Sequence, residues 1–253
     1  MQNETRLKLN WLLSYIFIFY LFVAAILVRL NISILLDLLP AFLVPLYLLH
    51  SFSEMSRRDA TLFLFVSFLV SYSFEYLGVT TGFPFGRYSY SSFLEPFIGP
   101  VPAIIPMMWA SLGYFCYMAS SSPLTSSLMM VALDTALDPR VSPHLWKWLD
   151  GGVYFGVPPL NFLGWFVTSL AIFLSFRKVS AHTQRDSGRY LLFYLMFGSA
   201  QSFTDAIVGL YLPALLSFLF VVSLFLLSRY FFKRNKEMFK SSTTASYGDR
   251  RRT

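Results

Sequence analysis

The sequence has few of the residues on which redox and metal chemistry depend. Cys116 is its single cysteine, so the chain can form neither an internal disulfide nor a CxxC pair nor a thiolate zinc cluster. Its three histidines, His50, His144 and His182, lack the partner three or four residues away that a helical metal site requires. Motifs for dinucleotides (GxGxxG), for a P-loop and for a nucleophile elbow (GxSxG) are also missing. We therefore expect no cofactor and no metal site.

Charged residues are scarce as well. They make up 13% of the 253 residues, against roughly a quarter in an ordinary soluble domain. Hydrophobic residues reach 56% and aromatic residues 19%, which excludes a water-soluble globule and suits a lipid-embedded protein that handles an apolar substrate. The net charge of +7 is typical of nucleic-acid binding, but here the lysines and arginines lie at the ends of apolar runs. We therefore expect membrane lipids as their partners, and no nucleic acid.

Long apolar runs recur along the chain, and a bilayer core requires roughly 20 such residues per helix. They predict an all-α fold, a polytopic integral membrane helix bundle of about eight transmembrane helices. This domain is expected to fill residues 1–232, and the basic segment 233–253 is expected to be a disordered cytoplasmic tail. The expected spans are about Trp11–Val28, Ile32–His50, Ala60–Gly78, Val101–Ser120, Leu124–Asp138, Leu160–Phe176, Tyr190–Gly209 and Leu212–Phe232.

Basic residues indicate the orientation, because cytoplasmic loops carry an excess of lysine and arginine. With the N-terminus inside, sixteen of the 20 basic residues lie on the cytoplasmic side of the eight-span arrangement. The sequence therefore predicts a multi-pass protein of the cell membrane with both termini in the cytoplasm. The four basic residues left on the outer side are Arg29, Arg87, Arg140 and Lys147.

Acidic residues within or at the ends of these spans are candidates for function, because a charge in lipid is costly. Glu75, the pair Asp134 and Asp138, and Asp205 fall on three different helices, all near the outer face. Asp37 lies apart from them, nearer the middle of the second span. Each acid could simply be solvated at the interface, but the convergence of four of them favours a shared site.

Asp134 and Asp138 are four residues apart in DTALD, so a helix places them on one face. Pro139 is expected to end that helix directly after them. Two carboxylates so close in a low-dielectric site do not both ionise easily, and one is expected to keep a proton near neutral pH. The spacing alone is not specific, because it also occurs among magnesium ligands for diphosphates and at solvated helix ends.

The connection formed by residues 78–102 is rich in glycine, proline and aromatic residues. Its glycines are spaced as in a GxxxGxxxG helix-packing motif, but Pro84 and the surrounding threonines and tyrosines favour a folded loop. Such a loop can fold back as a lid over an apolar cavity. Arg87 is its only cation, and we expect it to pair with Glu75 or a neighbouring aspartate.

A second unusual segment follows the expected fifth span and contains WKWLDGG and a run of glycines and prolines. Its tryptophans are typical of an interfacial aromatic belt. The glycines and prolines predict a turn that returns the chain to the membrane at Asn161, close in depth to Asp138. Asn161 fits either a helix-capping role or a place in the site, and His144 is expected at the surface.

These segments resemble the membrane-integral carotenoid biosynthesis proteins, a family that includes bisanhydrobacterioruberin hydratase and gamma-carotene hydratases. The resemblance covers roughly the middle of the chain and implies cofactor-free addition of water to the terminal double bond of a long acyclic carotenoid. It also implies an apolar carotenoid within the bilayer as substrate, and other carotenoid biosynthesis enzymes as partners. It rests on FEYLGVTTGFPFGRYSY (Phe74–Tyr90), GPVPAIIPMMWA (Gly99–Ala110), ALDTALDPR (Ala132–Arg140) and WKWLDGGVYFGVPPLNFLGW (Trp146–Trp165).

Hydration of a trisubstituted alkene needs an acid, surroundings that tolerate a tertiary carbocation, and a base that activates water. Carboxyl groups with different proton affinities can act as acid and base. Aromatic faces can stabilise the cation by about 0.5–2 kcal/mol each. The catalytic candidates are Glu75, Asp134, Asp138 and Asp205, and the substrate-binding candidates are Arg87, Tyr88, Trp109, Asn161 and Trp165.

Two other functions stay open at this point. A prenyltransferase resembling the UbiA family would hold magnesium and a prenyl diphosphate on Asp-rich motifs, but only one DxxxD is present here and few cations lie on the outer side. A non-enzymatic transporter would relay protons along its acids, but these acids cluster at one depth.

Overall fold

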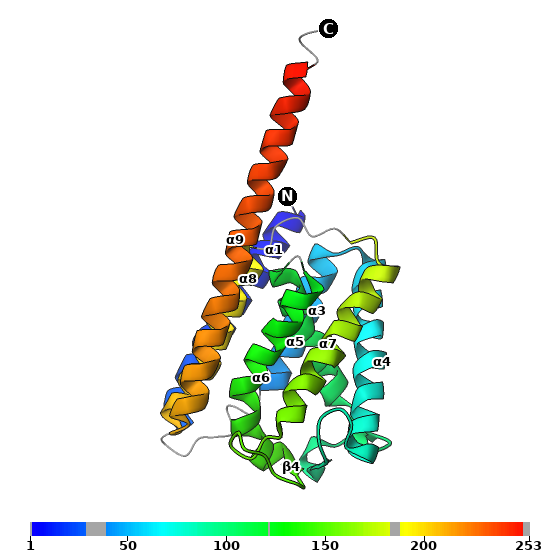
Figure 1. Ribbon diagram of the computed structural model, residues 1–253, viewed down its shortest axis with the longest axis vertical. Helices are drawn as coiled ribbons and strands as arrows, with labels where there is room; N and C mark the ends of the chain where they lie inside the picture. Colours follow the sequence, from blue (N-terminus) through cyan, green and yellow to red (C-terminus); the bar gives the residue numbers. More distant parts are fainter. Residues whose placement is uncertain (1, 29–38, 121, 183–187, 250–253) are drawn as a thin grey trace.

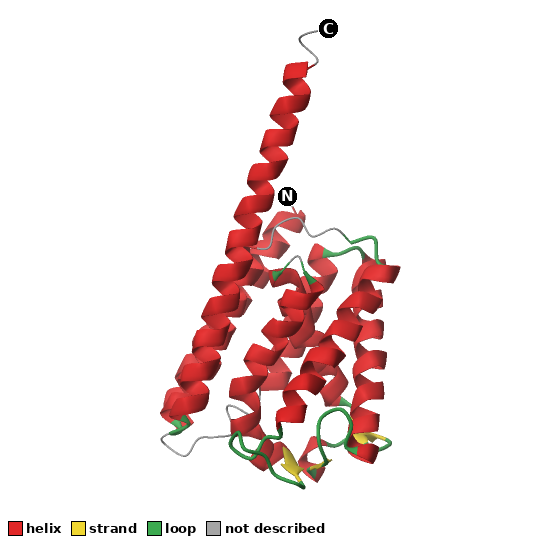
Figure 2. Cartoon of the chain, viewed as in Figure 1, coloured by secondary structure: helices red, strands yellow, loops and turns green. Residues whose placement is uncertain are grey.

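Eight α-helices make up the part of the chain that the computed structural model describes, residues 2–28, 39–120, 122–182 and 188–249 (Figures 1 and 2). They are α1 (Gln2–Val28), α3 (Leu39–Glu54), α4 (Arg57–Thr81), α5 (Ile104–Ala119), α6 (Pro123–Leu145), α7 (Pro159–Val179), α8 (Gly188–Ile207) and α9 (Tyr211–Asp249). Successive helices run in opposite directions, and helices distant in sequence pack together, as α1 does with α8 and α4 with α7 (Figure 1). The predicted all-α class is confirmed.

Four helices of this described part are long and apolar enough to cross a membrane, namely α1 from Glu4, α4, α7, and α9 as far as Arg234. They make the chain a multi-pass membrane protein, but the prediction of eight transmembrane helices is wrong. Helix α5 and the described part of α3 have 16 residues each, about 24 Å, which is less than the roughly 30 Å of a bilayer core. Helices α6 and α8 are longer but carry buried polar groups, among them Asp138 and Asp205, that face other helices.

Two predicted features lie wholly or partly outside the described residues. Asp37 belongs to the segment 29–38, and so does the first part of the expected second span, Ile32–His50. The described portion of that span is α3, which begins at Leu39 and is buried on the side that contains Leu43 and Tyr47.

A buried polar network connects four helices near the end of the bundle that contains the N-terminus. The imidazole of His50 on α3 has its Nε2 atom 2.8 Å from Ser14 Oγ on α1 and its Nδ1 atom 3.3 Å from the hydroxyl of Tyr190 on α8. The Tyr190 hydroxyl is in turn 3.0 Å from that of Tyr114 on α5. Because His50 is fully buried and each of its ring nitrogens has a partner, we assign it a structural role.

Helix α6 continues through Pro139 and Pro143 to Leu145, so the prediction that Pro139 ends the helix is wrong. A proline lacks the N–H that would bond to the carbonyl four residues earlier, here that of Thr135. The hydroxyl of Tyr154 donates to this carbonyl oxygen at 2.9 Å and replaces the missing bond. The side chains after Asp138 are therefore placed by a helix and not by a loop.

The connections at the other end of the bundle form a folded layer, residues 82–103 and 146–158, which we call the loop layer. The expectation of a folded loop is confirmed, because α4 ends at Thr81 and Gly82 caps it in the left-handed conformation. Strand β1 (Tyr88–Tyr90) pairs antiparallel with β4 (Trp146–Trp148), with Tyr88 opposite Trp148. The layer also contains the 3-10 helix η1 (Ser92–Leu94) and the antiparallel strands β2 (Phe97–Ile98) and β3 (Val101–Pro102).

Helix α9 extends beyond the bundle and runs to Asp249, so most of the segment predicted as a disordered tail has a helical backbone (Figure 1). The sequence has neither proline nor glycine between Pro213 and Gly248, and nothing in it interrupts the helix. This extension lies at the same end as the N-terminus and opposite the loop layer (Figure 2).

Candidate active site

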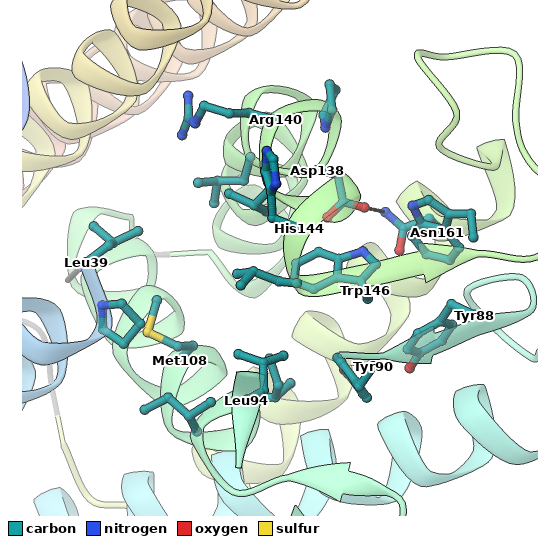
Figure 3. A pocket seen from close by; sticks show the side chains of 18 of the residues that line it. Leu39, Tyr88, Tyr90, Leu94, Met108, Asp138, Arg140, His144, Trp146 and Asn161 are labelled. Carbon is teal, nitrogen blue, oxygen red and sulfur yellow. Dashed lines mark hydrogen bonds between the residues drawn. The ribbon is translucent and has the colours of Figure 1, made fainter. Parts of the chain in front are cut away.

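A cavity of about 460 Å³ lies beside the loop layer, within the range of roughly 300–1,000 Å³ that small-molecule sites have. Its wall combines residues of α4 to α7, of β1 and β4, of the ends of α1 and α3, and of the turn between α8 and α9. Apolar side chains dominate that wall. Tyr88, Asp138 and Asn161 lie toward one side of the cavity, and the polar side chains of Arg140 and His144 lie apart from Tyr88 and Asn161 (Figure 3).

Glu75 is held at this polar side by three hydrogen-bond donors. Its Oε2 atom accepts from the hydroxyls of Tyr88 at 2.5 Å and Tyr90 at 2.6 Å, and its Oε1 atom accepts from Trp109 Nε1 at 2.7 Å. Glu75 is 6% exposed, so these donors take the place of water. Burial, and next the charge of Glu75, raise the pKa of the Tyr88 and Tyr90 phenols well above the ordinary value, so both stay protonated donors at neutral pH.

Asp134 and Asp138 share a single amide. Asn161 donates from Nδ2 to Asp134 Oδ2 at 2.8 Å and to Asp138 Oδ2 at 2.6 Å, and all three side chains are buried. The Oδ1 atoms of both aspartates have no hydrogen-bond partner among the described residues. Asn161 lies in the first turn of α7, so the predicted turn does return the chain to the depth of Asp138. Its amide bridges the two acids and does not cap the helix.

The cavity wall includes six of the nine predicted site residues. They are Glu75, Tyr88, Trp109, Asp138, Asn161 and Trp165. The indole rings of Trp109 and Trp165 lie 4.4 Å apart between centroids and form an aromatic surface. Asp134 is behind Asp138 and outside the wall, although Asn161 joins it to the site.

Asp205 is not part of the cavity wall. It forms a buried ion pair with Arg140, and Arg140 is part of the wall. Arg140 also donates to the backbone oxygen of Gln201 at 3.1 Å and to the Gln201 side chain. The structure thus places Asp205 where it fixes a cation beside the cavity. His144, expected at the surface, is exposed and lies on the wall one turn after Arg140 (Figure 3).

Arg87 lies outside the cavity wall and does not pair with Glu75. It forms a bidentate ion pair with Asp150, a neighbouring aspartate of the loop layer, and both side chains are largely exposed. The hydrogen bonds from Arg87 hold the pKa of the Asp150 carboxyl below its ordinary value. The pair joins the two halves of the loop layer next to the β1 and β4 strands.

Sequence reasoning missed Tyr90, Arg140 and Trp146, all of which line the cavity. A signal for two of them was present, because YSY and WKW each place two aromatic rings on one face of a strand. Nothing in the sequence shows that these strands pair. Among the residues that the structure describes, no group of three or more His, Cys, Asp or Glu side chains gathers where it could hold a metal ion.

A model of the carotenoid biosynthesis protein family matches residues 32–224, well over half of the chain. The chain belongs to the carotenoid biosynthesis protein family. The matched range contains all nine predicted site residues and every residue of the cavity wall except Val28, and it confirms the resemblance that the sequence motifs indicated.

The chain is similar in sequence to a curated protein, the bisanhydrobacterioruberin hydratase of Haloarcula japonica. The two sequences are 31% identical over 148 residues, which cover 53% of this chain and 50% of the relative. The chain therefore spans about half the length of the relative that it matches. No solved structure matches the chain.

Proposed function

We propose that this carotenoid biosynthesis protein is a carotenoid hydratase, which adds water to the terminal carbon–carbon double bond of a long acyclic carotenoid. The observation that carries this proposal is an apolar cavity with two buried carboxyl arrangements at one side, the amide-bridged aspartates and the triply bonded Glu75. Family membership and the name of the relative support a carotenoid substrate and a hydration reaction. The chemistry needs no cofactor.

Asp138 is the proton donor in this proposal, because it is the member of the pair that lines the cavity. Its O–H bond breaks as a C–H bond forms at the less substituted alkene carbon, and a tertiary carbocation remains. The oxygen of one water then bonds to the tertiary, positively charged carbon. The proton released from the water returns to the Asp138 carboxylate, so the site regains its starting state.

The carbocation is stabilised by charge and by aromatic faces. Glu75 supplies the negative charge, and its three donors fix where that charge lies. Trp109 and Trp165 add cation–π attraction, about 0.5–2 kcal/mol each. Asp205 acts on the site only through Arg140, whose charge it balances.

The test uses membranes that contain the full chain, lycopene as substrate, and isotopically labelled water. We expect a product that is heavier by one water and that carries the labelled oxygen in a tertiary alcohol. Asp138→Asn keeps size and hydrogen bonding but removes the acidic proton, so it should lower the rate at least about 10²-fold. Glu95→Gln, an exposed change in the loop layer, serves as the control and should leave the rate unchanged.

Two outcomes would contradict the proposal. Wild-type turnover by Asp138→Asn, at equal membrane expression, would remove this residue as the acid. Loss of all turnover on addition of a magnesium chelator would favour the prenyltransferase alternative, because the proposed hydration involves no divalent ion.

A further inference from the structure

The cavity extends beyond the groups that hydration uses. Opposite Tyr88 and Asn161, its wall passes Met108 and reaches Leu39 at the start of α3 (Figure 3). Apolar residues at three helix ends form this far part of the wall, which we call the apolar rim. The rim consists of Val28 at the end of α1, Leu39 and Pro40 at the start of α3, and Val208 and Leu210 between α8 and α9.

A long, stiff substrate needs an apolar exit from the cavity. The conjugated chain of a long carotenoid is a rigid rod, so it cannot coil up inside a cavity of about 460 Å³. One end can enter, and the rest of the chain must pass out through the wall. The exit has to be apolar, because a polyene in contact with water loses the hydrophobic stabilisation it has in lipid.

The rim is the part of the wall that meets this requirement. It lies beside α1 and α9, two of the helices that are long and apolar enough to cross a membrane. Val208 is 39% exposed, and the neighbouring Leu212 on α9 is 51% exposed, so the surface next to the rim continues as apolar side chains. The opposite part of the wall carries Asp138, Asn161 and the aromatic strands of the loop layer instead.

We infer that the apolar rim binds the polyene chain where it leaves the cavity for the bilayer. This inference rests on the proposed hydratase function and specifies its substrate, a long chain of which only one end is enclosed. The rim thereby provides a second binding region. It contacts the polyene chain, whereas the end that reacts binds inside the cavity.

A labelling experiment on the full chain in phosphatidylcholine vesicles tests the inference. Native Cys116 is fully buried, so a cysteine introduced at Val208 is the reactive thiol. Lycopene should slow maleimide labelling of Val208→Cys about tenfold when present at about ten times its dissociation constant. Leu160→Cys is the matched control, since Leu160 is 40% exposed at the same end of the bundle but outside the wall, and its labelling should not change.

A bulky substitution provides the second measurement. Leu39→Trp should fill the rim and lower kcat/KM for lycopene by about ten- to a hundredfold, whereas Leu160→Trp should not. Equal protection of Val208→Cys by squalane, a saturated hydrocarbon, would show an unspecific apolar surface and overturn the inference.

The combined outcomes separate the inference from the proposed function. Hydration without protection at Val208→Cys would overturn the inference and leave the function in place. Protection without hydration would support the rim as a carotenoid site and overturn the function. Absence of both would overturn both.

Discussion

At the scale of single residues, the site contains carboxyl groups in two contrasting settings. Three donors surround Glu75, so hydrogen bonds stabilise an ionised carboxylate there. Asp134 and Asp138 share the amide of Asn161, and each keeps an oxygen without a partner among the described residues. An oxygen without a partner can carry a proton, so we propose that the acid is a member of this aspartate pair.

Asp134→Asn should be less harmful than Asp138→Asn, because Asp134 lies behind the wall and acts on the substrate through its neighbour. We expect hydration of lycopene to fall by well under the roughly 10²-fold loss expected for the acid itself. The comparison needs both variants in membranes at equal expression. Equal inactivity of the two would show that the division of roles within the pair is wrong.

Tyr88→Phe should remove one of the three hydrogen bonds that the Glu75 carboxyl accepts. Loss of a hydrogen bond to a charged group is expected to lower the free energy of unfolding by about 1.5–3 kcal/mol and to slow hydration. Tyr76→Phe is the control, because Tyr76 is 45% exposed on the same helix as Glu75. Unfolding in detergent and lycopene turnover measure the two effects.

The same tyrosines predict a sensitivity to alkali. Their pKa values are raised in the folded protein, by burial and then by Glu75, so the stability they contribute is fully present below the ordinary tyrosine pKa of about 10. It is lost as the pH rises above that value, because the unfolded chain then releases protons that the folded chain retains. Thermal unfolding at increasing pH should show this loss, and the loss should be smaller in Tyr88→Phe.

At the scale of elements, Phe85 of the loop layer is wedged between α4 and α7. Each helix has a glycine at the contact, where a Cβ atom would come within 2.7 Å of the Phe85 ring at Gly78 and within 2.4 Å at Gly164. The Phe85 ring also lies 6.2 Å from that of Tyr88, so the wedge sets the position of the strand that carries the Glu75 donors. The two glycines thus connect helix packing to the site.

Gly164→Ala should therefore displace Phe85 and destabilise the fold by about 1–3 kcal/mol, as overpacking does. Gly113→Ala on α5 is the control, since its Cβ would meet Phe173 at an ordinary 3.5 Å and alanine favours a helix. Thermal unfolding and lycopene hydration should both suffer in the first variant and not in the second. Unchanged activity in Gly164→Ala would show that the wedge does not position Tyr88.

Local sequence rules predicted some elements and failed for others. The folded loop after α4 was predictable, because glycine and proline punctuate residues 78–102. The end of α6 was not, because Tyr154 compensates the effect of Pro139 from a distant part of the chain. The same holds for the pairing of β1 with β4 and for the amide of Asn161 between the two aspartates, both of which depend on tertiary contacts.

At the scale of the whole molecule, the acids that the sequence grouped by depth do lie toward one end of the bundle, although eight full spans are not present. The grouping depended on the alternation of helix direction, and that alternation holds even for helices too short or too polar to cross a bilayer alone. The ion pairs were less predictable from the sequence, because Asp205 pairs with Arg140 and Asp150 with Arg87 as a result of tertiary packing.

The orientation in the membrane stays a prediction, with both termini in the cytoplasm and the loop layer outside. A reporter enzyme that is active only outside the cytoplasm should be inactive when fused after Lys240 and active when inserted next to Glu95. The reverse pattern would place the site on the cytoplasmic face.

The position of the polar side of the cavity has a consequence for the order of products. In the proposed reaction, a hydroxyl made beside the loop layer would be released at the level of the lipid headgroups, and the unreacted end of the carotenoid would point into the opposite leaflet. A second hydration of the same molecule requires the new alcohol to cross the hydrocarbon core, at a cost of roughly 2–7 kcal/mol for an unbonded hydroxyl. A substrate with two acyclic ends should therefore accumulate as the mono-alcohol before any diol forms, and a time course of lycopene products would display that lag.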